Sequence, residues 1–399
     1  MSDDTVYPDG GTQTRGWQSF RADAANTGVV RAGTTSAEES STTPTRRWAT
    51  ILGPRVQSSP AIVDGTVYVG SWDGCLYALD AHSGDIRWET ETDAVIRSSP
   101  AVADSLVANE SGAQSPQRTV YVGGYDDTVY ALDAATGECR WTAETDDAVF
   151  ASPAIAPLPP ASGDSETQAG VAVYIGSWDG TITTLDPATG ETIWSFDTGK
   201  TVFSSPAVVP RADAAATADE YTAFVGDDDG MLYALDAALG ESRWHRELDG
   251  QVRASPAVAH ETVYVGTHGG TLHALEAASG EPRWRADTDG RIWSSAAVTD
   301  DAVYVGSYDN NVYAFNPESG ERLWTAETGA EVFASPAVDG DTVYVGSWDT
   351  HLYAFDAHTG DVRWRYECGD GVYSSPAVTD DTIYVGCRDG TLHAIGLPP

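Results

Sequence analysis

Residues 332–364 read VFASPAVDGDTVYVGSWDTHLYAFDAHTGDVRW, and this stretch decides the fold. It contains four short runs rich in β-branched and aromatic residues, separated by the turn signals Asp-Gly, Trp-Asp and Thr-Gly. Runs of this kind favour strands, and short turns with Gly or Asp join strands that lie side by side. The stretch therefore predicts one four-stranded antiparallel meander.

The same pattern recurs along the chain, and one tryptophan marks the end of each copy. The gaps between these tryptophans are 40, 53, 53, 50, 40, 40 and 40 residues. A period of about forty residues made of short strands is typical of radial or solenoid repetition. Eight such units predict an all-β fold, an eight-bladed β-propeller. The tryptophans are Trp48, Trp88, Trp141, Trp194, Trp244, Trp284, Trp324 and Trp364.

The last copy of the repeat is incomplete. After Thr391–Ile395 the sequence continues as Gly-Leu-Pro-Pro, with no fourth run and no tryptophan. A matching run, Arg46-Arg47-Trp48, precedes the first copy. We expect this N-terminal strand to complete the last blade, because ring closure removes two open sheet edges.

The domain organisation follows from the extent of the repeat. Residues 46–399 are expected to form a single propeller, although length alone would favour more than one domain. Residues 1–45 lack the repeat and are expected to be an extended lead-in, held against the propeller by Trp17, Phe20 and Asn26-Thr27-Gly28. Three longer connections, at 103–118, 156–170 and 209–220, are rich in Ala, Ser, Asp, Pro and Gly. They predict solvated loops on one face, with a role in docking a partner left open.

The chain is strongly acidic, with 60 Asp and Glu against 22 Lys and Arg and a net charge of −38. Lys200 is its single lysine. Nucleic acid is an improbable partner because phosphate binding needs clustered basic residues. We interpret the acidic, lysine-poor composition as adaptation to a high-salt cell, such as that of a halophilic archaeon, where ions screen the self-repulsion.

Several features bear on compartment and assembly. The sequence shows no basic and apolar signal segment and no apolar run of membrane-spanning length, which favours a cytoplasmic location. Cys75, Cys139, Cys368 and Cys387 fall in different repeats without a CxxC spacing, so free thiols are expected. No two histidines have metal-ligand spacing, so no metal site is expected. A monomer is the expected state.

The most regular string is A-x-D-x-x-T-G-x-x-x-W, as in Ala354, Asp356, Gly360 and Trp364. Its glycine suits a positive φ, its aspartate accepts amide hydrogen bonds in the turn, and its indole packs between sheets. The motif resembles the tryptophan-docking motif of the quinoprotein, or PQQ-like, propellers, over about residues 46–397. Departures occur at four positions, Thr184, Leu239, Glu276 and Asn316.

Two rings of positions are expected to converge on one face of the propeller. The first ring is the third residue before each repeat's proline, or before the equivalent Ala296: Gln57, Arg97, Phe150, Phe203, Arg253, Trp293, Phe333 and Tyr373. The second ring lies in the turn between the second and third strands: Trp72, Tyr125, Trp178, Asp228, His268, Tyr308, Trp348 and Arg388. Aromatic side chains beside arginines suit a flat ligand or a peptide. The alternative is that the rings simply fill the mouth of the channel.

The resemblance implies two functional classes. The quinoprotein dehydrogenases would imply PQQ with a Ca²⁺ ion held by Glu, Asn and Asp, together with an Asp base. This chain has no vicinal cysteine pair and no haem-attachment motif, and its run Asp227–Gly230 fills an ordinary turn. It is more similar to the non-catalytic branch, the outer-membrane-assembly lipoproteins and archaeal PQQ-repeat proteins. That branch implies a scaffold without cofactor or catalytic residues, which binds a protein or small ligand on the ring face.

Overall fold

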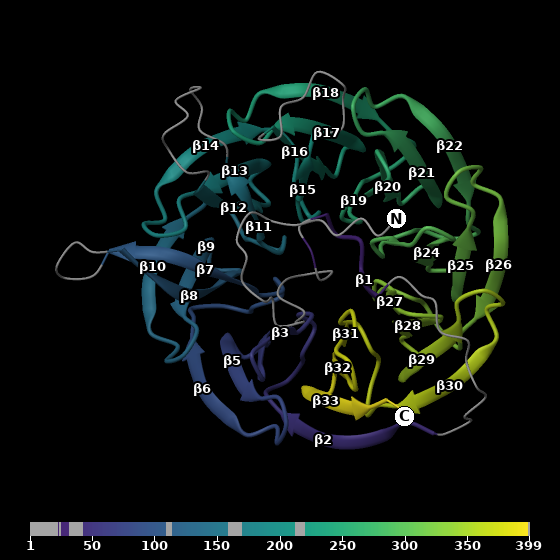
Figure 1. Ribbon diagram of the computed structural model, residues 1–399, viewed down its shortest axis with the longest axis horizontal. Coiled ribbons are helices and arrows are strands. Elements are labelled where there is room, and N and C mark those ends of the chain that lie inside the picture. Colours follow the sequence, from purple (N-terminus) through teal and green to yellow (C-terminus); the bar gives the residue numbers. More distant parts are fainter. Residues whose placement is uncertain are drawn as a thin grey trace.

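The computed structural model describes residues 23, 25–31, 43–108, 114–158, 170–211 and 220–397. In this part of the chain thirty-three strands form eight sheets, arranged as blades around a central axis (Figure 1). The described residues include no helix that is long and apolar enough to cross a bilayer. The predicted eight-bladed, all-β propeller is confirmed.

Each blade is a meander that runs from the axis outward. Blade 1 contains β3 (Ala61–Val63), β4 (Thr66–Gly70), β5 (Cys75–Asp80) and β6 (Ile86–Glu91). Blade 2 contains β7 (Ala101–Ala108), β8 (Gln114–Gly123), β9 (Thr128–Asp133) and β10 (Cys139–Glu144). Blade 3 contains β11 (Ala154–Leu158), β12 (Gly170–Gly176), β13 (Thr181–Leu185) and β14 (Thr192–Asp197). Blade 4 contains β15 (Ala207–Pro210), β16 (Tyr221–Gly226), β17 (Met231–Asp236) and β18 (Ser242–Glu247).

The second half of the ring repeats this order. Blade 5 contains β19 (Ala257–Ala259), β20 (Thr262–Gly266), β21 (Thr271–Glu276) and β22 (Pro282–Asp287). Blade 6 contains β23 (Ala297–Val298), β24 (Val303–Gly306), β25 (Asn311–Phe315) and β26 (Arg322–Glu327). Blade 7 contains β27 (Ala337–Asp339), β28 (Thr342–Gly346), β29 (His351–Asp356) and β30 (Val362–Glu367). Blade 8 contains β31 (Ala377–Val378), β32 (Thr382–Gly386) and β33 (Thr391–Gly396).

The outer strand of blade 8 comes from the other end of the chain. Strand β2 (Thr45–Ile51) pairs antiparallel with β33, with Trp48 opposite Ala394. The ring of Trp48 lies 5.8 Å from that of Tyr384, measured between centroids. The predicted closure is therefore confirmed, and the last blade has no unpaired outer edge at β33.

The repeated tryptophans join neighbouring blades. Trp324 lies on the outer strand of blade 6. Its indole N–H donates to the carbonyl of Ala357 in blade 7, at 2.9 Å. Gly360 covers the same indole: it has φ +76°, and a Cβ there would lie 2.8 Å from the ring. Equivalent N–H bonds of 2.8–3.1 Å are made by Trp48, Trp88, Trp141, Trp194, Trp244 and Trp284. The motif glycine is thus required both by its turn and by the indole.

A girdle of eight serines closes the ring near the axis. The backbone N–H of each serine donates to the side-chain oxygen of the serine in the next blade, at 2.9–3.1 Å. The circle ends where Ser375 of blade 8 donates to Ser59 of blade 1. These buried amides therefore have partners although they lie outside the sheets. The girdle consists of Ser59, Ser99, Ser152, Ser205, Ser255, Ser295, Ser335 and Ser375.

The N-terminal segment lies against the inner strands. Strand β1 (Val29–Arg31) pairs parallel with β27, and the carbonyls of Thr27 and Gly28 accept from Val298 and Val338. The buried amide of Asn26 donates to the carbonyl of Pro256 at 3.2 Å, and also to carbonyls in blade 4. The expected anchoring by Asn26-Thr27-Gly28 is found, whereas Trp17 and Phe20 lie outside the described residues.

One expected loop has a different structure. Strands β7 and β8 pair from Ala101↔Tyr121 as far as Ala108↔Gln114, so most of 103–118 is a long hairpin rather than a loop. Antiparallel pairing satisfies the backbone even where side chains are small, which composition alone did not reveal. The connections at 156–170 and 209–220 include residues 159–169 and 212–219, which lie outside the described residues.

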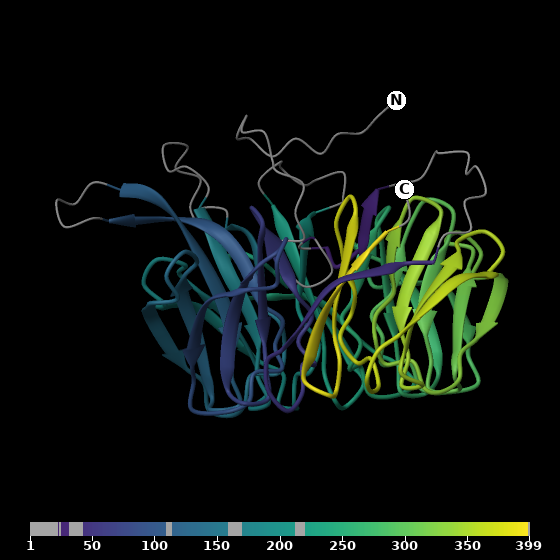
Figure 2. The same cartoon turned by 90° about the horizontal axis from the view of Figure 1, so that it is seen from below.

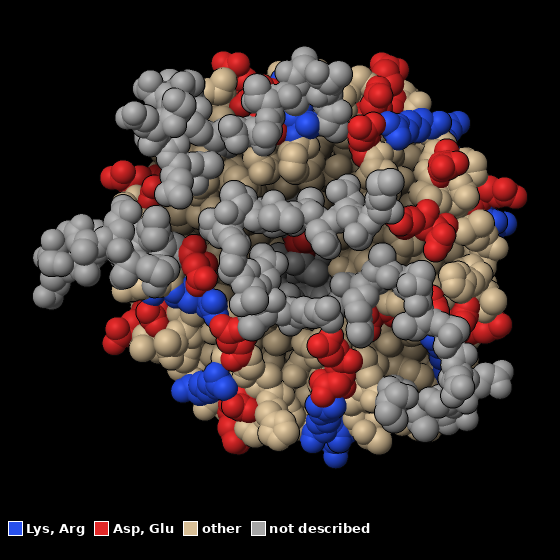
Figure 3. All heavy atoms as spheres, in the orientation of Figure 1, with Lys and Arg blue, Asp and Glu red and all other residues tan. Residues whose placement is uncertain are grey.

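The propeller has two different faces (Figure 2). Turns between the second and third strands lie at one edge of the disc, together with the segments that lead into each first strand. Strand β1 and the extended β7–β8 hairpin lie toward the other edge (Figure 2). On this second face, Asp and Glu side chains are distributed around the rim (Figure 3). The two rings of candidate residues belong to the first face.

Candidate binding face

The first ring, which is the inner one, is positioned by the alternation of side chains along each segment that leads into a blade. In blade 7 the buried Val332 packs against Gly306 of blade 6, where a Cβ would lie 2.2 Å from its Cγ1. The side chains of successive residues in extended chain point to opposite sides, so Phe333 and Ser335 face the axis. The same alternation in all eight blades brings the whole first ring and the serine girdle around one central cavity.

This cavity is small. Its volume is about 70 Å³, because the inner ring fills most of the channel. Gln57 is buried, and the other fifteen residues of the two rings are each half-buried. The floor of the face is therefore a nearly closed layer of side chains, as the alternative interpretation expected.

Arg97 contacts side chains of blades 2, 3 and 8. Its guanidinium donates to the hydroxyl of Tyr125 at 3.1 Å and to that of Tyr373 at 2.9 Å. It also lies over the ring of Phe150, 4.6 Å from the centroid. Burial raises the pKa of Tyr373, so its hydroxyl stays protonated. Among the described residues, no carboxylate forms an ion pair with Arg97.

Arg253 belongs to a second polar cluster on the ring face. It binds Asp228 through both carboxylate oxygens, at 2.5 and 2.9 Å, and lies 4.3 Å from the centroid of Phe203. Gln251 donates to Asp228 at 3.1 Å and contacts Nδ1 of His268 at 2.9 Å. Burial, helped by the charge of Arg253, lowers the pKa of His268 to about 4. His268 is therefore neutral at pH 7.

A continuous series of aromatic contacts connects the blades. Phe333 stacks on Trp348 at 4.4 Å and lies 4.2 Å from Tyr308, between ring centroids. Trp178 lies 5.0 Å from Phe203, which lies 6.2 Å from Trp293. Each contact buries apolar area and also favours a particular relative orientation of the two rings. The predicted site residues are therefore brought together into one rigid aromatic surface.

Polar atoms without a protein partner concentrate on this face. Among the described residues eleven buried side-chain nitrogen or oxygen atoms have none, and seven of these belong to the two rings. They are Gln57 Oε1, Trp72 Nε1, Arg97 Nε, Trp178 Nε1, His268 Nε2, Trp348 Nε1 and Arg388 Nε. Five of the seven are N–H donors. An unmade buried hydrogen bond costs about 1–3 kcal/mol, so this concentration makes the face the candidate binding surface.

Sequence reasoning missed some members of the site. Arg55 lies 4.5 Å from the centroid of Trp72, and Gln251 links Asp228 to His268. The serine girdle was also missed, although a serine stands two residues after every inner-ring position. That invariant serine within the repeat was the available signal.

The ring face does not fit PQQ with Ca²⁺. Asp228 is the one carboxylate in the two rings, and Arg253 already occupies both of its oxygens. Ca²⁺ needs six or more oxygen ligands. The single group of three potential metal ligands found in the described residues contains sulfur and nitrogen donors, and it lies elsewhere. We therefore derive no redox chemistry at this face.

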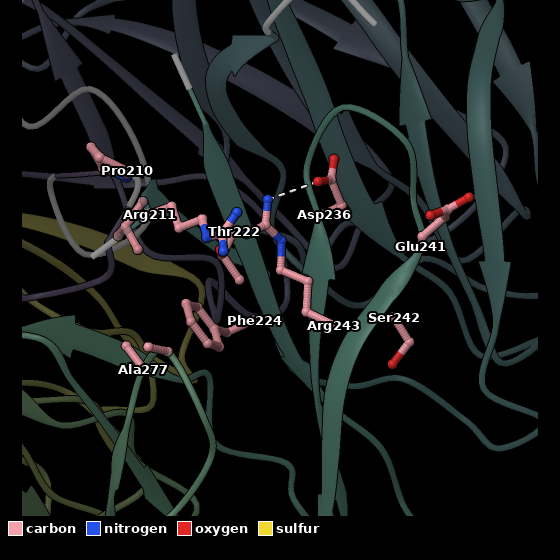
Figure 4. A pocket seen from close by; sticks show the side chains of 11 residues that line it. Pro210, Arg211, Thr222, Phe224, Asp236, Glu241, Ser242, Arg243 and Ala277 are labelled. Carbon is pink, nitrogen blue, oxygen red and sulfur yellow. Dashed lines mark hydrogen bonds and ion pairs between the residues drawn. The ribbon is translucent and has the colours of Figure 1, made fainter. Parts of the chain in front are cut away.

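A second cavity, of about 390 Å³, lies between blades 4 and 5 (Figure 4). Both arginines that line it are paired: Arg243 binds Asp236 at 2.7 Å, and Arg211 binds Glu220. Asp236 is also the docking-motif aspartate of blade 4, and its Oδ1 accepts the amides of its own turn. This arrangement is explained by the fold.

Comparison with known families gives two partial matches. Residues 215–397 match the family described as beta-alanine-activating enzyme, beta-propeller, and residues 31–116 and 108–158 match that described as outer membrane protein assembly factor BamB. Escherichia coli BamB is 29% identical over 28% of this chain and 29% of its own. The serine/threonine-protein kinase AfsK of Streptomyces griseus is 38% identical over 31% of this chain and 14% of its own.

A dehydrogenase is also similar. The quinohemoprotein alcohol dehydrogenase of Comamonas testosteroni is 34% identical over 23% of this chain and 12% of its own. The matched segments thus span less than a third of these relatives. Its crystal structure superposes with TM-score 0.70 and 16% identity over 96% of this chain and 81% of that one. Moraxella catarrhalis BamB superposes with TM-score 0.67 and 22% identity, over 89% and 98%.

The fold, the docking motif and these matches agree. Segments of the chain are thus similar to the propeller repeats of assembly factors and of dehydrogenases, and the whole chain shares their fold.

Proposed function

We propose that this chain is a non-enzymatic propeller scaffold that docks a protein segment on its ring face. One observation carries the proposal: seven buried polar atoms without partners gather among the aromatic side chains of a single face. Docking of a partner's polar groups would recover hydrogen bonds that the free protein leaves unmade.

The chemistry of these atoms defines the partner. Five N–H donors come from Trp72, Trp178, Trp348, Arg97 and Arg388. They suit a partner segment rich in carbonyl and carboxylate acceptors, placed over the half-buried aromatic rings. Arg97 lacks a carboxylate partner among the contacts of this face, so an acidic side chain of the partner fits it best.

The size of the cavity favours a peptide surface over a small-molecule pocket. Small-molecule sites enclose about 300–1,000 Å³, whereas this central cavity holds about 70 Å³. A partner would therefore lie across the face rather than enter it. The relative named as an assembly factor supports the general mode, a rigid disc that presents a face to proteins.

The test uses peptides of defined composition. Peptides selected by display on the immobilised protein in molar KCl are titrated, by fluorescence anisotropy, against the wild type and the double variant Arg97→Ala/Trp293→Ala. We expect enrichment of acidic residues and at least about a tenfold loss of affinity in the variant, because Arg and Trp dominate such surfaces. Equal affinity of the two proteins would refute the ring face as the docking surface.

A matched control separates binding from folding. Arg246→Ala/Leu323→Ala removes a partly exposed arginine and an exposed apolar side chain, both on outer strands far from the rings. This variant should bind as the wild type does. Melting temperatures of all three proteins establish that they are folded.

The alternative function is a PQQ- and Ca²⁺-dependent dehydrogenase, favoured by the similarity to alcohol dehydrogenases. Titration with PQQ and Ca²⁺, followed by absorbance and a dye-linked alcohol assay, tests it. The scaffold proposal expects no turnover. Alcohol-dependent dye reduction that requires both PQQ and Ca²⁺ would replace the scaffold by the enzyme.

We further propose that the chain works as a monomer in a salt-rich cytoplasm. The net charge of −38 supports the high salt, and the four free cysteines are typical of a reducing compartment.

A further inference from the structure

A buried cluster of two cysteines and a histidine lies where blade 7 meets blade 8. Cys368 follows the end of β30, Cys387 follows β32, and His393 lies in β33. The two Sγ atoms and a ring nitrogen of His393 are all within 4.8 Å of one another. Cys368, Cys387 and His393 are 5%, 0% and 6% exposed. Residues expected to be unrelated thiols are thus brought together by the ring.

Comparison with the other blades shows that the residues of this cluster depart from the repeat at all three positions. At the position of Cys368 five other blades have threonine, whose hydroxyl bonds a turn carbonyl. At the position of Cys387 four other blades have serine, and at that of His393 five have tyrosine. Three independent departures from the repeat therefore meet at one point. Each replaces an oxygen donor by a sulfur or imidazole ligand.

The histidine has a nitrogen to spare. Its Nδ1 lies 3.3 Å from the hydroxyl of Tyr366, while its Nε2 is buried and has no hydrogen-bond partner in the part of the chain that the structure describes. When metal-bound histidines use one ring nitrogen as ligand, the other is usually held by a hydrogen bond that orients the ring. Tyr366 fills that orienting role here.

We propose that Cys368, Cys387 and His393 bind one zinc ion. Thiolate and imidazole are preferred zinc ligands, whereas hard cations such as Ca²⁺ prefer oxygen. Two thiolates balance the charge of Zn²⁺, so the buried complex is neutral. Bond lengths of about 2.3 Å to sulfur and 2.0 Å to nitrogen place tetrahedral ligands about 3.5 Å apart, so the cluster closes with shifts of about 1 Å. The fourth position is left for water.

The location of the cluster suits a structural role in ring closure. The carbonyl of Cys387 accepts a hydrogen bond of 3.0 Å from the backbone of Val56, which opens blade 1. The cluster therefore lies at the seam where the two chain ends close the ring. A zinc ion here would clip blade 7 to blade 8 and stabilise the closed ring, since metal bound only by the folded state adds to folding stability.

The proposal is tested by metal content and by a cobalt spectrum. Full-length protein is stripped with chelator under reducing conditions, reloaded with zinc, dialysed in molar KCl and analysed for metal. We expect about one zinc per chain and a higher melting temperature than the stripped protein has. Cobalt in place of zinc should give thiolate charge-transfer absorption, which reports sulfur ligation directly.

Variants are chosen from the repeat so that they retain the fold. Cys368→Thr/Cys387→Ser/His393→Tyr restores the residues most frequent in the other blades, and it should lose both the metal and its effect on melting. Cys75→Ser/Cys139→Ser is the matched control, because it removes two thiols elsewhere and should keep about one zinc per chain. If the triple variant is unstable, His393→Tyr alone serves the same purpose.

Three outcomes would overturn the proposal. They are a reduced wild type with four free thiols that retains no zinc, a triple variant that retains as much as the control, and a Cys368–Cys387 disulfide in protein purified under reducing conditions.

Discussion

At the residue scale, the docking tryptophans carry two interactions at once. The indole of Trp324 covers apolar surface between blades, and its N–H binds a carbonyl of the next blade at 2.9 Å. It is 8% exposed and packs against Gly360. Because the contact crosses the boundary between blades, its loss affects the ring and not only one sheet.

Substitution Trp324→Ala is expected to lower the free energy of unfolding by about 3–5 kcal/mol, through the lost burial and the cavity that it leaves. Trp324→Phe should cost less, because most of the apolar ring remains. Denaturant unfolding in molar KCl measures both. A loss below about 1 kcal/mol for the alanine variant would contradict the docking role.

The lowered pKa of His268 predicts that the stability of the protein depends on pH. This pKa is lowered from 6.5 to about 4, by burial first and by Arg253 and Arg291 next. Between these values the unfolded chain binds a proton that the folded chain does not. Stability therefore falls as pH decreases from 6.5 toward 4.

The variant His268→Gln lacks this group and should lose less stability over the same pH interval. Unfolding free energies of both proteins at pH 7, 6, 5 and about 4 give the comparison, and acidic residues common to both cancel. Parallel curves would show that His268 does not titrate in this way.

At the scale of elements, the ring is closed by β2 and by the serine girdle. Strand β2 pairs with β33 over Thr45–Ile51, and Ser375 bonds Ser59 across the same seam. Strand β1 makes a separate contact with β27 on the inner side. Truncation from the N-terminal side can remove β1 alone, or β1 and β2 together.

Two truncations distinguish their roles. A chain starting at residue 45 keeps β2 and loses β1, whereas a chain starting at residue 53 loses both. We expect the second to unfold at lower denaturant and to associate, because the edge of β33 is then open. Light scattering and denaturant unfolding test this, and equal behaviour of the two chains would show that β2 does not close the ring.

At the scale of the whole molecule, acidic charge dominates. Asp and Glu side chains are spread around the rim seen in Figure 3, and the sequence carries a net charge of −38. Like charges at this density destabilise the compact state, and salt reduces their repulsion because the Debye length falls to about 3 Å at 1 M.

The melting temperature is therefore expected to rise from dilute buffer to molar KCl. Scanning calorimetry over a KCl series measures it, and a sucrose series separates screening from general exclusion effects. A melting temperature that is constant or falls with KCl would contradict adaptation to high salt.

The amino-acid sequence by itself determined the eight blades, the closure by Trp48 and the members of both rings. The reason is that a local pattern repeated eight times favours a closed ring, in which β2 covers the outer edge of β33 and the docking tryptophans pack between neighbouring blades. The hairpin within 103–118 escaped this reasoning, because its composition resembles that of a loop.

Only the tertiary structure decided which distant residues meet. Cys368 and His393 lie 25 positions apart in the sequence and in different blades, and no spacing rule joins them. The surroundings of Trp72 and Arg388 likewise depend on side chains of neighbouring blades, Arg97 over Trp72 and Trp348 under Arg388. A repeat specifies the position of each blade, but the contacts between blades depend on how residues from several copies pack in three dimensions.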